Sequence, residues 1–173
     1  MKETRKGFIM PITEAVPGKG PGDTVKIEKK GKIVEVKNKN KTLETGKIWQ
    51  FLRPSSEVNN RLKGKQTSKH LWINLYEFQP GGAVDEHYRE YNKTNMPIFD
   101  EALYVISGRI RAKVGDIEKI VGPGTLIYFP SNAVVSFTNI GKGKKARYLK
   151  IGASEEGKLQ GTAIYFKPPT YKA

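Results

Sequence analysis

The sequence predicts an all-β protein, a barrel or sandwich of antiparallel strands with at most one or two short helices. Short β-rich runs recur along the 173 residues, and Gly, Pro and Asn separate them. Helical periodicity is scarce, and the length suits a single domain with a buried core. In chain order, the expected strands are TVKIE (24–28), KIVEVK (32–37), KIWQFLR (47–53), LWINLYEF (71–78), ALYVISGRIRAKV (102–114), GTLIYFP (124–130), AVVSFTNI (133–140), ARYLKIG (146–152) and TAIYFK (162–167).

The first two runs alternate apolar and polar residues on either side of Lys29-Lys30-Gly31, which predicts a β-hairpin. The run SSEVNNRL (55–62) is the one plausible helix, with Ser55 or Ser56 as its N-cap. No internal repeat or second domain is evident. We therefore expect an irregular N-terminal arm over 1–24, a single β-barrel domain over 25–167 and a C-terminal tail over 168–173.

The chain is basic, with 31 Lys and Arg against 17 Asp and Glu and a net charge of +14. Aromatic RNA-binding patterns and a recognition helix are missing, so we interpret the excess as a solvated lysine surface and expect no nucleic-acid partner. The absence of cysteine excludes disulfides and thiolate metal sites. No apolar run reaches the roughly 20 residues of a membrane helix, and no signal peptide is evident, so we expect a cytoplasmic protein without membrane contact.

Two groups of residues in the middle of the chain have a regular spacing. In the first, five residues separate Gly81 from His87, and Arg89 follows two positions after His87. Further on, Glu101 is followed by the six residues ALYVIS and then by Gly108.

In the second group, Gly124 is followed by TLIYF and Pro130, and SNAVVSFT then leads to Asn139. The two spacings resemble the two motifs of the cupin superfamily over about residues 70–152. The resemblance implies a cupin-type jelly-roll β-barrel with extra N-terminal strands. The motif glycine after Pro130 is replaced by Asn132, the residue that next best tolerates a positive φ.

In cupins, a His-x-His pair, a Glu and a later His hold a divalent metal inside the barrel. In this chain Arg89 stands at the second His position and Val135 at the third, so that only His87 and Glu101 remain. An arginine only donates hydrogen bonds, and a valine has no lone pair. We therefore expect no metal and no other cofactor. The open alternative is a divalent metal on His87 and Glu101.

Alternation along a strand would place positions 85, 87, 89 and 91 on one face, so that Asp85 or Tyr91 could supplement such a site. By the same rule, Leu103 and Val105 face inward with Glu101. Val135, Phe137 and Asn139 share the opposite wall of the interior. An interior of this kind suits a small molecule held by a few polar anchors. The expected site consists of His87 and Glu101 as proton carriers, Arg89 as anchor for an anion and ion-pair partner of Glu101, and Tyr91, Val135 and Phe137 as further substrate contacts.

The residues between Arg89 and Glu101 form an insertion that is either a lid over the barrel or a passive surface loop. Three functions remain open. The first is binding of a small, anionic organic molecule, with possible turnover as an acid–base isomerase or lyase in which His87 works near neutral pH. The second is a metal-dependent dioxygenase or decarboxylase with an atypical site, and the third is a non-enzymatic binding or structural cupin. The resemblance also implies a homodimer formed through the N-terminal strands.

Overall fold

The computed structural model is an all-β protein, as predicted, and contains one short 3-10 helix, η1 (Ile12–Glu14), but no α-helix within the part of the chain that it describes. The predicted helix at 55–62 lies outside that part. None of the described helices is long and apolar enough to cross a membrane. The described residues are 9, 11–17, 24–38, 46–54, 67–68, 70–90, 99–130, 133–154 and 162–169.

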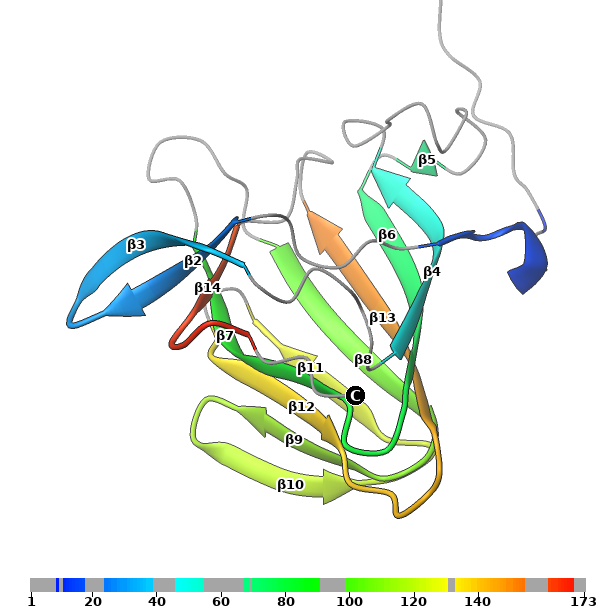
Figure 1. The fold of residues 1–173 in the computed structure, drawn as a ribbon. Coiled ribbons are helices and arrows are strands. Elements are labelled where there is room, and N and C mark those ends of the chain that lie inside the picture. The colour runs from blue at the N-terminus through cyan, green and yellow to red at the C-terminus, as the bar shows by residue number, and fades with distance from the viewer. Residues whose placement is uncertain are drawn as a thin grey trace, which may run out of the picture.

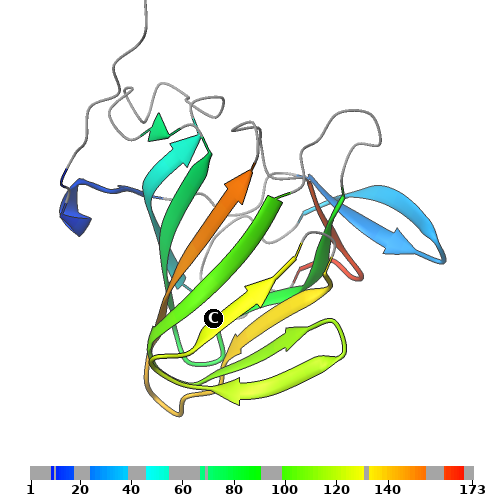
Figure 2. The ribbon, with the colours of Figure 1, turned by 180° about the vertical axis from the view of Figure 1, so that it is seen from behind.

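Two seven-stranded sheets face each other, and they approach at the end drawn at the bottom of Figures 1 and 2. Sheet A contains β1 (Val16–Pro17), β4 (Gly46–Pro54), β6 (Leu71–Phe78), β13 (Ala146–Ser154), β8 (Phe99–Ser107) and β11 (Leu126–Phe129) in this spatial order, with β5 (Thr67–Ser68) beside β4. Sheet B contains β10 (Ile117–Val121), β9 (Ile110–Val114), β12 (Val135–Asn139), β7 (Ala83–Glu90), β14 (Thr162–Tyr165), β2 (Thr24–Lys29) and β3 (Lys32–Lys37).

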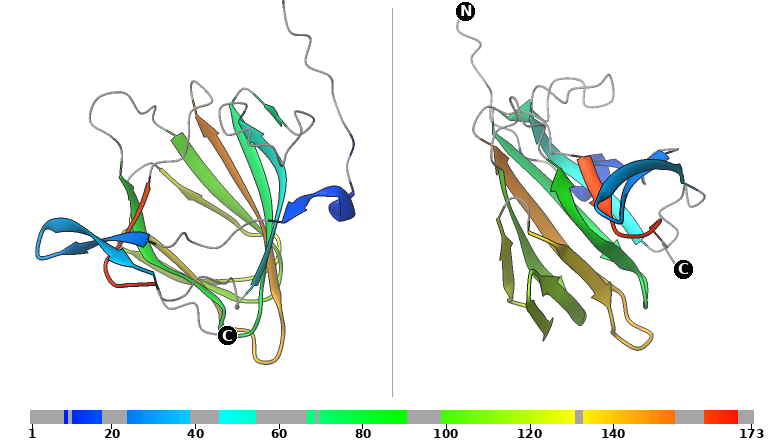
Figure 3. Two further views of the ribbon diagram at one scale, coloured as in Figure 1. Left: turned by 45° about the horizontal axis from the view of Figure 1, so that its top comes forward. Right: turned by 90° about the vertical axis from the view of Figure 1, so that its left-hand side faces the viewer.

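The predicted hairpin is confirmed as β2 and β3, which pair antiparallel with Lys29 opposite Lys32. Lys30 and Gly31 form the turn, with φ angles of 51° and 74°. Two central residues with positive φ are what a tight two-residue hairpin turn requires. The hairpin adds to sheet B through a parallel pairing of β2 with β14 and projects beyond the body of the two sheets (Figures 1 and 3).

The run expected as one strand over 102–114 is divided at Gly108 into β8 and β9, which belong to different sheets. Gly108 has a φ of 90°, and a Cβ added to it would lie 2.6 Å from the Cα of Ala146. Only glycine fits this crossing point. The next strand, β10, was not predicted. Its sequence, IEKIV, is largely apolar and β-branched, but it is short, mostly exposed and without regular apolar–polar alternation.

Other short strands also escaped prediction. Within residues 1–24, predicted to be an irregular arm, β1 pairs with β4 through Val16 and Gln50. Residues 141–145 form the turn between β12 and β13. The buried side chain of Asn139 secures this turn by donating to the carbonyl oxygen of Lys144 at 2.8 Å and accepting from the amide of Gly141 at 2.9 Å. The motif asparagine is therefore a structural residue that ties β12 to the following turn.

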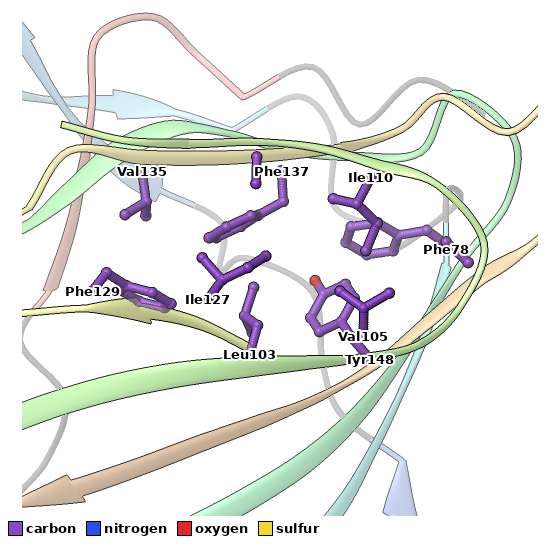
Figure 4. Close-up of a cluster of buried hydrophobic side chains, with 11 residues drawn as sticks. Phe78, Leu103, Val105, Ile110, Ile127, Phe129, Val135, Phe137 and Tyr148 are labelled. Atoms are coloured by element: carbon purple, nitrogen blue, oxygen red, sulfur yellow. The ribbon is translucent and has the colours of Figure 1, made fainter. Parts of the chain in front are cut away.

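The apolar core fills the end at which the two sheets approach each other. Both sheets contribute to it, and Figure 4 shows their side chains meeting face to face. Burial of this apolar surface is the main force that holds the sheets together. The buried members are Phe78, Leu103, Val105, Ile110, Ala112, Ile127, Phe129, Val135, Phe137, Ala146 and Tyr148.

Candidate ligand site inside the barrel

The strand register of sheet A arranges its inward side chains in layers. Directly opposed residues share a face, and so do residues two apart along a strand. The layers change from apolar to polar on moving away from the closed end of the core. From that end outward they are Phe78 and Ala146; then Tyr76, Tyr148 and Val105; then Asn74, Lys150 and Leu103; and finally Trp72, Gly152 and Glu101.

The outer two layers hold a buried ion pair. Nζ of Lys150 lies 2.6 Å from a carboxylate oxygen of Glu101, and the two side chains are 11% and 4% exposed. The same ammonium lies 5.9 Å from the ring centroid of Phe129, which is within the range of a cation–π contact. Lys150 was not predicted as a site residue. The sequence did contain a sign of it, because Lys150 is two residues from Tyr148 and four from Ala146 on the strand expected at 146–152, so the three side chains share a face.

Glu101 is buried, as expected from alternation with the buried Leu103 and Val105. Burial raises the pKa of its carboxyl, but the nearby charges of Lys150 and Arg89 and the hydrogen bond from Lys150 outweigh this effect. The net result is a lowered pKa, so that Glu101 is an anion at neutral pH.

His87 is also buried, at 4% exposure, and its ring packs against Tyr165 with 5.3 Å between the ring centroids. Its Nδ1 lies 2.8 Å from the backbone oxygen of Asp85, so Nδ1 carries the hydrogen and donates. Burial, followed by the charge of Arg89, lowers the pKa of His87 to about 3. The ring is therefore neutral near pH 7, whereas the sequence led us to expect a group that titrates there.

The pairing of β7 with β12 corrects the expected position of Asp85. Val135 pairs with His87 and Phe137 with Val84, so two residues of β12 face a span of three in β7. The extra residue is a β-bulge, and it breaks the alternation between Asp85 and His87. Asp85 therefore does not share the face of His87 by simple alternation.

Beyond the bulge, alternation resumes. His87 pairs with Tyr165 and Arg89 with Ala163 on β14, so His87 and Arg89 lie on the same face. Arg89 acts on the pKa of both His87 and Glu101. Of the other predicted contacts, Val135 and Phe137 are buried in the core, as Figure 4 shows, with Val135 directly opposite His87. Tyr91 and the insertion that follows it, up to residue 98, lie outside the described residues.

The metal centre that the resemblance implies does not fit the donors found here. No group of three His, Cys, Asp or Glu side chains comes together within the described part of the chain. Of the two family ligand types that remain, Glu101 already binds the ammonium of Lys150. An adjacent arginine further disfavours a cation. These donors therefore do not suit a divalent metal, and the expected absence of a metal stays a prediction.

The comparison with known families agrees with the motif spacing. Residues 74–152 match the family model of the cupin domain, so this part of the chain is a cupin domain. No curated protein matches the chain by sequence. Among solved structures, the polyketide cyclase RemF from Streptomyces resistomycificus is 14% identical, with a TM-score of 0.55, and the match covers 90% of this chain and 85% of RemF. At that identity, the likeness shows a shared fold.

Two further solved structures are similar over about half of the chain. The protein TT1209 from Thermus thermophilus is 25% identical with a TM-score of 0.43, and the match covers 50% of this chain and 75% of that one. A cupin superfamily protein from Desulfitobacterium hafniense is 17% identical with a TM-score of 0.41, and the match covers 51% and 71%.

Proposed function

We propose that the barrel interior binds a small organic anion through Arg89 and Lys150. The observation that carries this proposal is the buried Lys150–Glu101 pair with Arg89 acting on the same carboxylate. Within the described residues, the charges that act on His87 and Glu101 come from two cations, Arg89 and Lys150, and from one carboxylate, Glu101, while His87 itself is neutral. A buried excess charge is costly, and an anionic ligand would compensate it.

The two cations would bind the ligand carboxylate in different ways. The guanidinium of Arg89 presents parallel N–H donors that match the two oxygens of a carboxylate. The ammonium of Lys150 has three donors, and its bond to Glu101 at 2.6 Å also holds it in place. The apolar side chains of Val135 and Phe137 would contact the rest of the ligand.

Turnover by acid–base chemistry would use the same groups. The ionised Glu101 would take a proton from the carbon next to the ligand carboxylate, and the charge would move to the carboxylate oxygens as an enolate. Arg89 and Lys150 would stabilise that charge. His87 is neutral, and its single N–H is donated to the backbone oxygen of Asp85, so its Nε2 would accept a hydrogen bond from the ligand. RemF is a polyketide cyclase, but a shared fold does not carry a reaction with it.

A thermal-shift screen of small carboxylates, phosphates and enolisable acids, followed by calorimetry on the hits, tests the proposal. We expect Arg89→Ala to weaken the binding of carboxylate hits at least about tenfold, as is typical when a charged hydrogen bond is removed. Arg109→Ala is the matched control, because Arg109 is an exposed arginine. If Arg89→Ala bound every anionic hit as tightly as the wild type, the proposed anchor would be wrong.

A further inference from the structure

We infer that Asn74 belongs to the same site and that the ligand is a hydroxycarboxylate, with one negative charge and a hydroxyl group that donates to this asparagine. The inference rests on the proposed function, since it names the class of anion that the site takes.

Asn74 occupies the same layer of the interior as Lys150 and lies directly opposite it in the sheet register. On the other side it pairs with Gln50 of β4. Its side chain is only 2% exposed. An amide at such a position normally has its oxygen satisfied by a donor, because burying it without one destabilises the fold.

The side-chain oxygen of Asn74 accepts no hydrogen bond from the described residues. Lys150 is its cross-strand neighbour, but the ammonium of that lysine binds Glu101 in the next layer. The interior thus contains an acceptor next to the proposed anion site. A hydroxyl or N–H group on the ligand would satisfy it, and of these a hydroxyl fits a compact acid best.

The described charges of the site favour a ligand with a single negative charge. Arg89 and Lys150 are the cations that act on Glu101 and His87, and Glu101 is the carboxylate among them, so one anionic group balances these three charges. A dianion would bury a charge without a partner, which is costly in a low-dielectric interior. A monocarboxylate with one hydroxyl meets both the charge balance and the acceptor on Asn74.

Matched pairs of probes isolate the hydroxyl. Propionate is compared with lactate and 3-hydroxypropionate, and benzoate with its three monohydroxy derivatives, by calorimetry or ligand-observed NMR on the full chain. Phthalate tests the response to a second negative charge. In the wild-type protein we expect at least one hydroxy acid to bind about tenfold tighter than its parent acid, and phthalate to bind more weakly than benzoate.

Asn74→Leu should remove this hydroxyl preference, so that each hydroxy acid loses more affinity than its parent acid. The variant should keep the Tm of the wild type or exceed it, since it removes a buried acceptor without a described donor. If the Asn74→Leu variant does not fold, Asn74→Ala serves as the test in its place. Asn74→Asp keeps an acceptor but cancels the net charge, so it should lose the binding of all monoanions. Gln50→Leu is the matched control, because Gln50 is the amide residue that pairs with Asn74 on β4. This variant should retain the preference for hydroxy acids.

The outcomes separate this inference from the proposed function. If parent and hydroxy acids bind the wild type equally, or if Gln50→Leu removes the preference as Asn74→Leu does, the role of Asn74 is wrong and the anion site stands. If no monocarboxylate binds the wild type, or if binding is the same in Arg89→Ala, the anion site itself is wrong and this inference fails with it.

Discussion

Lys150 and Glu101 form an ion pair inside the barrel, with 2.6 Å between the ammonium nitrogen and a carboxylate oxygen. Glu101 stands at the position where the first cupin motif carries a metal-binding glutamate. In this chain the positive charge beside it belongs to the side chain of a neighbouring strand, β13. The cation that the carboxylate needs is thus covalently part of the protein.

Lys150→Met should destabilise the fold by about 3–5 kcal/mol, because it leaves the buried carboxylate of Glu101 without its ion-pair partner. The double variant Lys150→Met with Glu101→Leu should recover most of this loss, since no uncompensated charge then remains. Urea unfolding of the two variants and the wild type measures both effects. Equal stabilities of the double and single variants would contradict the pairing.

His87 should make the protein less stable as the pH falls from about 6.5. Its pKa in the fold is about 3, so between these values the unfolded chain binds a proton that the folded chain does not. The free energy of unfolding should therefore fall by about 1.4 kcal/mol per pH unit in that window. Above pH 6.5 the contribution of His87 should not vary.

His87→Gln should flatten this dependence. Unfolding by urea at pH 7.5, 6.5, 5.8 and 5.0 stays above the range in which Glu101 and other carboxylates take up protons in the unfolded state. The lowered pKa of Glu101 adds a separate loss of stability, which begins only as the pH falls below about 4.5. A wild-type slope that persists unchanged in His87→Gln would show that another group causes it.

Gly152→Ala should cost about 3 kcal/mol, because a Cβ at this position would lie 1.8 Å from the indole ring of Trp72. Gly122→Ala is the matched control. Neither glycine has a positive φ, and the nearest atom to a Cβ at Gly122 is 3.9 Å away. Urea unfolding followed by tryptophan fluorescence should separate the two variants clearly, and similar costs would mean that Trp72 does not cover Gly152.

The chain should form a dimer through its N-terminal strands. The hairpin strand β3 ends the strand order of sheet B and exposes Ile33 and Val34, at 42% and 39%. Such an exposed apolar edge is suited to pairing with another strand. Light scattering after size exclusion should give twice the monomer mass of 19.4 kDa, and a monomer mass would contradict this prediction.

Much of the fold followed from local sequence patterns. Alternating residues marked the hairpin and the inward positions of β8 and β12, and motif spacing indicated the cupin domain. The strand β10 escaped because it is short and its apolar and polar residues do not alternate. The division at Gly108 depended on a contact with Ala146 far along the chain.

The site was harder to predict for the same reason. His87, Arg89 and Glu101 were visible through the motif, but Lys150 joins them only when the register of β13 against β8 is known. A one-residue bulge in β7 displaced Asp85 from the alternation. The pKa of His87 is lowered first by burial, which depends on packing against other strands, and next by the charge of Arg89, which is close in the sequence.

A high-resolution crystal structure of the protein soaked with its tightest carboxylate hit tests the central claim most directly. The account predicts density for an organic anion with its carboxylate against Arg89 and Lys150 and with the Lys150–Glu101 pair intact. A metal ion between His87 and Glu101, identified by its anomalous scattering and with Lys150 turned away, would contradict it.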